Sequence, residues 1–211
     1  MFEWKEYEGL LLEHFGASCL DKSYIEHLRN SFIKIEDYWR SHNSNFSIER
    51  VIIGEAPLFK NSSYIYNANC SNTSFLWPSD FPNIKSGDKS YLLELLVRNK
   101  ISVVDAYPYA FNDFNTPEIT YKKLRSNKHK IFLMKSFQAY GLRRIKAILE
   151  NNPNVIISFR YKRNDKDLGE LVDQVIREDS SFPKRFVDLS SKNISIDKGK
   201  FEKFLKGILI N

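Results

Sequence analysis

Glu55 is an acidic residue whose immediate neighbours suit it to chemistry. It lies in the segment Gly54-Glu55-Ala56-Pro57, directly after the apolar residues 51–53. A glycine allows close approach of the backbone to a ligand, and a proline fixes the next bend of the chain. A carboxylate held between them can act as a general base or orient a water molecule. The alternative is that Glu55 only caps a following helix.

Asp105 is the second candidate acid, and it ends the largely apolar segment 101–105. A carboxylate in such a position should be partly buried, and a buried carboxylate needs hydrogen-bond donors or a raised pKa. Three aromatic residues, Tyr107, Tyr109 and Phe111, follow closely and could line a flat pocket. The alternative is aromatic core packing around a structural aspartate.

The segment 58–87 is rich in aromatic and small polar residues and has little periodicity. A loop of this length in a compact domain is usually functional or disordered, and its aromatic content argues against disorder. Aromatic faces interleaved with Asn and Ser suit stacking of a base or a sugar, although the same rings can equally pack on one another. The candidate ligand-binding residues are Tyr64, Tyr66, Asn67, Phe75 and Trp77.

A fourth group of candidates lies near the end of the chain, after the apolar segment 185–189. Small hydroxyls, a cation and an amide that precede a helix suit contacts with phosphate, although ordinary turns often have the same composition. The residues are Ser190, Ser191, Lys192 and Asn193.

Short apolar segments alternate with helical patterns along the chain and would position these residues. The expected strands are 51–53, 101–105, 155–159 and 185–189, and the expected helices are 23–40, 90–98, 128–150, 167–178 and 198–210. This alternation predicts a parallel sheet covered on both faces, hence a three-layer α/β/α sandwich with a central four-stranded parallel sheet. Ligands bind at the carboxyl ends of such strands, so we expect Glu55 and Asp105 to share a cavity there.

Length and composition bound the class of protein. The 211 residues fit a single α/β domain, with residues 1–45 as an N-terminal helical extension packed on the core. The net charge of +6 suits DNA as a partner, although many lysine-rich proteins are basic for no specific reason. A long apolar segment and a signal peptide are both absent, which predicts a cytoplasmic protein with no membrane contact.

No cofactor is expected from the motifs. The two cysteines, Cys19 and Cys70, are far apart and form no zinc or iron–sulfur knuckle, and the histidines lack metal-binding spacing. Phosphate-loop and dinucleotide fingerprints are absent from the first strand exit. We therefore predict a protein without metal, iron–sulfur cluster or nucleotide cofactor.

Gly54-Glu55-Ala56-Pro57 resembles the first motif of the uracil-DNA glycosylase superfamily, in its bacterial and archaeal branches. The segment Ser63-Tyr64-Ile65-Tyr66-Asn67 is similar to a Tyr-Phe-Tyr-Asn segment of small members. Residues 103–108 fall where the family has its second strand and base-reading loop, and residues 189–193 fall where it has His-Pro-Ser. The resemblance covers about residues 50–210 and implies a uracil-DNA glycosylase-like fold.

The resemblance implies excision of a DNA base by hydrolysis of the N-glycosidic bond of a flipped nucleotide. It assigns the alignment of water to Glu55 and the reading of the base edge to Asp105. Phe75 or Trp77 would stack on the base. Contacts to the phosphate backbone would come from Ser190, Ser191 and Lys192.

Two departures from the family pattern leave alternatives open. Ser190 stands where the family has the histidine that stabilises the leaving base, and Asp105 stands where uracil-excising members have asparagine. An ionised carboxylate only accepts hydrogen bonds and would repel O4 of uracil, so we predict a preference for another base. The alternatives are an inactive member that binds nucleic acid or a partner, and a small-ligand hydrolase that uses the same pocket.

Replacing Asp105 by Asn is expected to change the base preference, because an amide both donates and accepts hydrogen bonds. Excision or binding is compared for the wild type and Asp105→Asn on oligonucleotides that carry different modified bases. An unchanged preference would contradict the assignment of Asp105 to the base edge.

Overall fold

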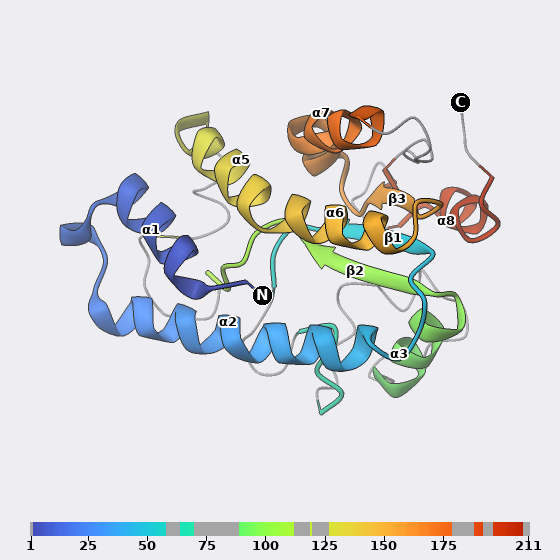
Figure 1. Ribbon diagram of the computed structural model, residues 1–211, viewed down its shortest axis with the longest axis horizontal. Helices are drawn as coiled ribbons and strands as arrows, with labels where there is room; N and C mark the ends of the chain where they lie inside the picture. Colours follow the sequence, from blue (N-terminus) through green and yellow to red (C-terminus); the bar gives the residue numbers. More distant parts are fainter. Residues whose placement is uncertain are drawn as a thin grey trace.

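The computed structural model describes residues 2–57, 64–69, 89–111, 119, 127–178, 188–191 and 196–208. In this part of the chain, helices flank a small parallel sheet, so the protein is a mixed α/β protein (Figure 1). The helical elements are α1 (Trp4–Phe15), η1 (Ala17–Cys19), α2 (Lys22–Asn43), α3 (Lys89–Arg98), η4 (Asn127–His129), α5 (Lys130–Ala139), α6 (Gly141–Asn151), α7 (Lys162–Glu178) and α8 (Lys198–Leu205). The strands are β1 (Arg50–Gly54), β2 (Ile101–Asp105) and β3 (Ile156–Phe159).

The sheet has the strand order β2-β1-β3, and both pairs of neighbours are parallel. All three strands coincide with predicted apolar segments to within two residues. The register places Gly54 beside Asp105 and Ile53 beside Phe159. The last residues of β1 and β2 therefore lie at the same edge of the sheet.

The predicted fourth strand, 185–189, falls mostly outside the described residues. At its end, the Leu189 backbone N–H donates to the Phe159 carbonyl at 2.8 Å, so the chain runs beside β3 at this point. Ser190 and Ile196 form an isolated antiparallel bridge. The described sheet thus has three strands, and the four-stranded sheet stays a prediction.

Both faces of the sheet are covered, which explains why the strands are apolar throughout. Val51, Ile53 and Phe159 belong to one buried cluster together with residues of α1, α2, α5, α6 and α7. Ile52 and Val103 belong to a second cluster, to which α3 and α8 contribute. Residues that alternate along a strand point to opposite faces, so each face has its own core.

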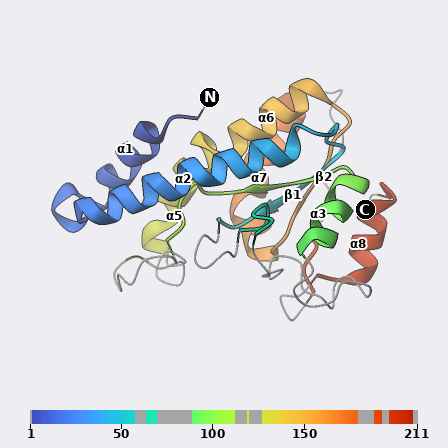
Figure 2. The ribbon, with the colours of Figure 1, turned by 90° about the horizontal axis from the view of Figure 1, so that it is seen from below.

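β2 is an outer strand of the described sheet. Helix α2 runs along its free side and covers it (Figure 2). The Trp39 indole N–H donates to the Val103 carbonyl at 3.0 Å. The Tyr66 hydroxyl accepts from the Val103 N–H at 2.5 Å and lies 3.2 Å from the Val103 carbonyl. These side chains satisfy backbone groups that an edge strand would otherwise expose.

The predicted long helix 128–150 is wrong, because the chain breaks into α5 and α6 at Tyr140. This residue leaves helical geometry, with φ −120° and ψ −78°. At the next position, a Cβ on Gly141 would lie 2.9 Å from the Asp105 carbonyl oxygen and from the Phe137 ring. The close approach of α6 to the end of β2 therefore requires a new helix start at a glycine.

The predicted ends of the last two helices also differ from the structure. Helix α7 begins at Lys162, five residues earlier than expected, where the Ser190 hydroxyl accepts the Lys162 backbone N–H at 3.1 Å. A side chain from a distant segment thus caps the first turn, and such a cap leaves no local sequence signal. Helix α8 ends at Leu205 rather than at 210, and Gly207 follows with φ +68°.

Gly141→Ala is expected to destabilise the protein by about 1–3 kcal/mol, because the added methyl group overlaps the Asp105 backbone and the Phe137 ring. Gly9→Ala is the matched control, since a Cβ at Gly9 in α1 meets nothing within 4 Å. Alanine should stabilise that helix by roughly 0.5–1 kcal/mol. Urea unfolding measures the free energy of unfolding of both variants. Equal changes would contradict the close approach of Gly141 to Asp105 and Phe137.

Candidate functional site

The first two strand exits run side by side at the carboxyl edge of the sheet. Beyond the paired residues Gly54 and Asp105, the backbone N–H of Ala106 donates to the Gly54 carbonyl at 3.3 Å. The N–H of Tyr107 donates to the Glu55 carbonyl, also at 3.3 Å. The parallel pairing therefore continues past the strands and brings the two candidate acids to the same edge.

Glu55 forms an ion pair with Arg163, the second residue of α7. Its side chain is 19% exposed, so the pair is partly accessible to solvent. The Tyr107 side chain is buried nearby, and burial raises the pKa of its hydroxyl, an effect that Glu55 reinforces and Arg163 opposes. A carboxylate and a guanidinium from two exits thus pair here, within electrostatic range of a phenol from a third exit.

Asp105 lies in a different and more buried environment, with only 5% of its surface exposed. Desolvation raises the pKa of its carboxyl from 3.8 to about 7, and Glu36 contributes in the same direction. Arg144 and a hydrogen bond with Tyr64 oppose the increase. At neutral pH this carboxyl is partly protonated, so it can both donate and accept a hydrogen bond. The base preference predicted from an ionised Asp105 stays a prediction, and it applies to the ionised fraction of this carboxyl.

A buried ion pair between α2 and α6 borders Asp105. Arg144 Nη2 lies 2.5 and 2.6 Å from the two carboxylate oxygens of Glu36. The Tyr140 hydroxyl donates to Glu36 Oε1 at 2.8 Å. The two predicted catalytic acids thus follow neighbouring strands but have different partners. Glu55 pairs with Arg163 of α7. Asp105 lies beside the ion pair that joins α2 to α6.

Three predicted ligand-binding residues, Tyr64, Tyr66 and Asn67, lie in a turn packed on the sheet. Both tyrosines are less than 5% exposed, and burial raises the pKa of Tyr66 to about 12. The Lys89 ammonium donates to the Tyr64 carbonyl at 3.1 Å, and the Asn67 side chain accepts from the Asn69 N–H. Tyr66 supports the edge of β2, whereas Tyr64 lies beside Asp105.

The aromatic residues after Asp105 have separate positions. Tyr109 and Phe111 pack in the core, where the Tyr109 hydroxyl donates to the Tyr7 carbonyl at 2.9 Å. The alternative of core packing is thus confirmed for these two. Tyr107 lies by Glu55 as described above. Of the first exit, Pro57 is buried and Ala56 packs against the core.

Ser190 is held within the protein at the fourth exit. Its hydroxyl donates to Asp188 Oδ1 at 2.5 Å and accepts the first N–H of α7. The Lys200 ammonium contacts the Ser190 carbonyl at 3.0 Å. These bonds give Ser190 a structural role, and Ser191 is its half-buried neighbour. The predicted residues Phe75, Trp77, Lys192 and Asn193 lie outside the described residues.

Sequence reasoning missed Arg163, Glu36 and Arg144. Arg163 follows β3 by four residues, so its place just beyond a strand exit was an available signal. Glu36 and Arg144 interrupt the apolar faces of α2 and α6, and a charge at such a position signals a buried pair. The sequence did not indicate that Arg163 would pair with Glu55, or that Arg144 would pair with Glu36.

His14 and His129 form another long-range contact, with 2.7 Å between Nε2 of the first and Nδ1 of the second. Desolvation lowers the pKa of both rings. Within the described part of the chain, no group of three or more His, Cys, Asp or Glu side chains could hold a metal ion. The helices described there include none that could cross a membrane.

Comparison with known proteins finds no family model, no curated protein and no solved structure that matches this chain.

The stability difference between Asp105→Asn and the wild type is expected to depend on pH. Folding raises the pKa of Asp105 from 3.8 to about 7. Between these two pH values the folded protein keeps a proton on Asp105 that the unfolded chain has lost. Wild-type stability therefore falls as the pH rises from 4 to 7, and the penalty is complete above 7. At about 1.4 kcal/mol per pKa unit, the variant should gain up to about 4 kcal/mol relative to the wild type over this range. Unfolding experiments from pH 4 to 8 measure the difference, and a constant value would contradict the raised pKa of the buried Asp105 carboxyl.

Proposed function

We propose that this protein is a DNA base-excision hydrolase that cleaves the N-glycosidic bond of a flipped nucleotide. The observation that supports it most is Glu55 at the carboxyl edge of the sheet, paired with Arg163 and adjacent to Tyr107. In this proposal the fold is uracil-DNA glycosylase-like, with residues 185–189 as its fourth strand. The hydrogen bond from Leu189 to Phe159 supports that placement.

Glu55 and Arg163 have complementary roles in the proposed reaction. As the bond between the sugar and the base breaks, the base leaves with the electron pair and the sugar becomes cationic. The Glu55 carboxylate stabilises this cation and orients the water whose oxygen bonds to the sugar carbon. The proton released by the water goes to Glu55 and then neutralises the base. Arg163 orients Glu55 and offers N–H groups to the departing base, where the resembled family uses a histidine.

Asp105 is proposed to contact the edge of the flipped base. Because the pKa of its carboxyl is about 7, its protonated form donates and its ionised form accepts. The preferred base is therefore expected to vary with pH near neutrality. The net charge of +6 supports DNA as the polymer that presents this base.

A second candidate is a protein of the same fold that binds nucleic acid without cleaving it. Ser190 favours this reading, because its hydroxyl already bonds to Asp188 and to the first turn of α7. Ser190, which stands at the position of the family histidine, thus uses its hydroxyl for hydrogen bonds within the protein.

Glu55→Gln is expected to lower base excision by roughly 10²- to 10⁴-fold, because the amide cannot take the proton of the attacking water. The measurement is base release from oligonucleotides that contain uracil, hypoxanthine, xanthine or an alkylated base. Glu94→Gln is the matched control, since it removes an exposed Glu–Arg pair, with Arg98, that is located on α3. The control should retain full activity.

The results separate the two candidates. Excision that survives Glu55→Gln would contradict the proposed role of Glu55. If the wild type binds DNA but releases no base, the second candidate replaces the first. Binding should weaken steeply with salt in either case, because phosphate contacts release counterions. Binding that is insensitive to salt would contradict both candidates and favour a small-ligand hydrolase.

A further inference from the structure

The positive charge of this chain comes from one segment, residues 119–149. The segment contains nine lysines and arginines, and no acidic residue lies between Glu118 and Glu150. Because the whole chain carries +6, the residues outside the segment together carry −3. A block of charge of one sign is typical of a surface that binds a polyanion such as nucleic acid.

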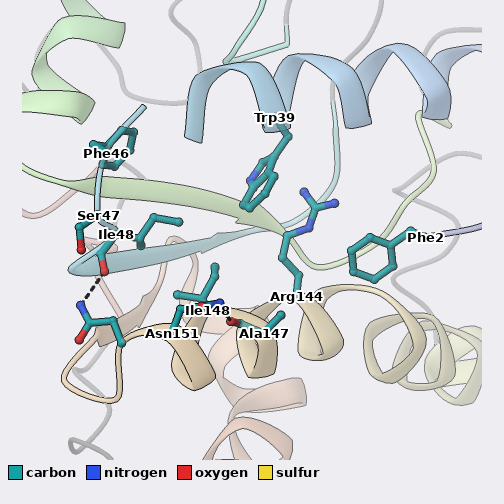
Figure 3. Close-up of a pocket in the computed structure, with 10 residues that line it drawn as sticks. Phe2, Trp39, Phe46, Ser47, Ile48, Arg144, Ala147, Ile148 and Asn151 are labelled. Atoms are coloured by element: carbon teal, nitrogen blue, oxygen red, sulfur yellow. Dashed lines mark hydrogen bonds between the residues drawn. The ribbon is translucent and has the colours of Figure 1, made fainter. Parts of the chain in front are cut away.

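Arg144 belongs to this segment, but it is buried and already paired. Its side chain is 3% exposed, and Nη2 is bonded to both carboxylate oxygens of Glu36. It lines a cavity of about 370 Å³ between α2 and α6, where its guanidinium lies next to Trp39 (Figure 3). The other residues that line this cavity are uncharged, so the cavity offers no cation to a phosphate group.

Three exposed cations of the segment lie on α5 and α6. Lys135 is 2.7 Å from Glu13, and Arg143 is 2.6 Å from Glu6, so both are paired with acids of α1. Lys146 is exposed on α6, which leads from the end of β2 to the start of β3. These three cations are therefore either neutralised or directed away from the carboxyl edge.

The turn at η4 holds two further lysines at the surface. Lys128 and Lys130 are exposed on the two sides of His129. Nδ1 of His129 is 2.7 Å from Nε2 of His14, and its ring centre is 5.6 Å from that of Phe15. These contacts fix the turn against the end of α1. In the described part of the chain, Lys128 has no ion-pair partner, and Lys130 has one long contact with α7.

That contact places the turn close to the candidate acid. The Lys130 ammonium lies 3.8 Å from Asp167 Oδ1. Asp167 follows Arg163, the partner of Glu55, by one turn of α7, and its charge also acts on Tyr107. One such turn is about 6 Å long, and successive nucleotides of a DNA strand are about 3.4 Å apart along the duplex. A strand that reaches Glu55 would thus pass these lysines within a few phosphates.

The DNA backbone needs contacts of this kind from an element other than the fourth exit. Ser190, which the resemblance assigned to phosphate contacts, uses its hydroxyl within the protein. Lysine ammonium groups bind phosphate as point charges. We propose that Lys128 and Lys130 contact the phosphates of the DNA strand that presents the flipped nucleotide at Glu55. This inference rests on the proposed function, but binding rather than base release tests it.

The double variant Lys128→Gln/Lys130→Gln removes both charges from the surface of η4 and α5. Its affinity is measured by fluorescence anisotropy over a range of salt concentrations. The probe is a labelled DNA duplex with one stable abasic analogue, which requires no base preference. Each lost phosphate contact lowers the slope of log affinity against log salt by about 0.9, so the slope should fall by about 2. The affinity at low salt should fall at least about fivefold.

Lys203→Gln/Lys206→Gln is the matched control, because it removes the same charge from exposed lysines near the end of α8. Arg50, at the start of β1, donates to the Phe204 and Leu205 carbonyls. This end of α8 therefore lies toward the amino ends of the strands. Charges are screened over about 10 Å at 0.1 M salt, so the control should keep the wild-type slope.

Asp167→Asn tests the opposite direction, since it removes the carboxylate that competes for Lys130. The affinity for the duplex should rise by up to about fivefold, as expected when an exposed ion pair is released. Asp37→Asn is its control, because it removes the exposed partner of Arg40 on α2 and should leave the affinity unchanged.

Base release from the same samples separates this inference from the proposed function. If the slope falls as expected but no base is released, the phosphate surface stands and base excision is contradicted. If a base is released but the Lys128→Gln/Lys130→Gln variant keeps the wild-type slope, the inference is overturned. An equal loss of slope in the α8 control, or binding of the wild type to polyglutamate and not to DNA, would also overturn it.

Discussion

The ion pair between Glu36 and Arg144 is the interaction on which much of this structure depends. It joins α2 to α6, both partners are almost completely buried, and Tyr140 donates a further hydrogen bond to the carboxylate. Loss of one partner of such a pair costs about 3–5 kcal/mol, because the other charge stays buried alone. The pair also acts on Asp105, because Arg144 lowers and Glu36 raises the pKa of its carboxyl.

Burial also separates the roles of the two acids at the carboxyl edge. Glu55 retains some solvent contact and has a cationic partner, Arg163, whereas Asp105 is enclosed and experiences both Arg144 and Glu36. Two carboxyl groups that leave neighbouring strands thus differ in chemistry because of their surroundings.

Local sequence patterns were sufficient to predict the three described strands and most of the helices. Apolar segments rich in Val and Ile favour strands. The helix α2 was predictable because its apolar residues recur at helical spacing. The break at Tyr140 could not be predicted, because it depends on the contact of Gly141 with the end of β2. The start of α7 depends in the same way on Ser190, a residue that follows it in sequence.

The site was predictable only in part for the same physical reason. Adjacent parallel strands bring Glu55 and Asp105 to the same edge, and that follows from the order of elements. The partners of each acid do not follow from it, because Arg163 is 108 residues from Glu55 and Arg144 is 108 residues from Glu36. Tyr66 and Tyr109 illustrate the limit for aromatic residues, since sequence alone does not decide whether a ring faces a ligand or the core.

The origin of the oxygen in the product shows whether the protein hydrolyses an N-glycosidic bond. The protein is incubated with a base-modified oligonucleotide in water enriched in heavy oxygen, and the products are weighed by mass spectrometry. Hydrolysis at Glu55 should release a free, unlabelled base and leave one heavy oxygen on the sugar carbon of the resulting abasic site. Intact DNA, or label in the base instead of the sugar, would contradict hydrolysis of the N-glycosidic bond at Glu55.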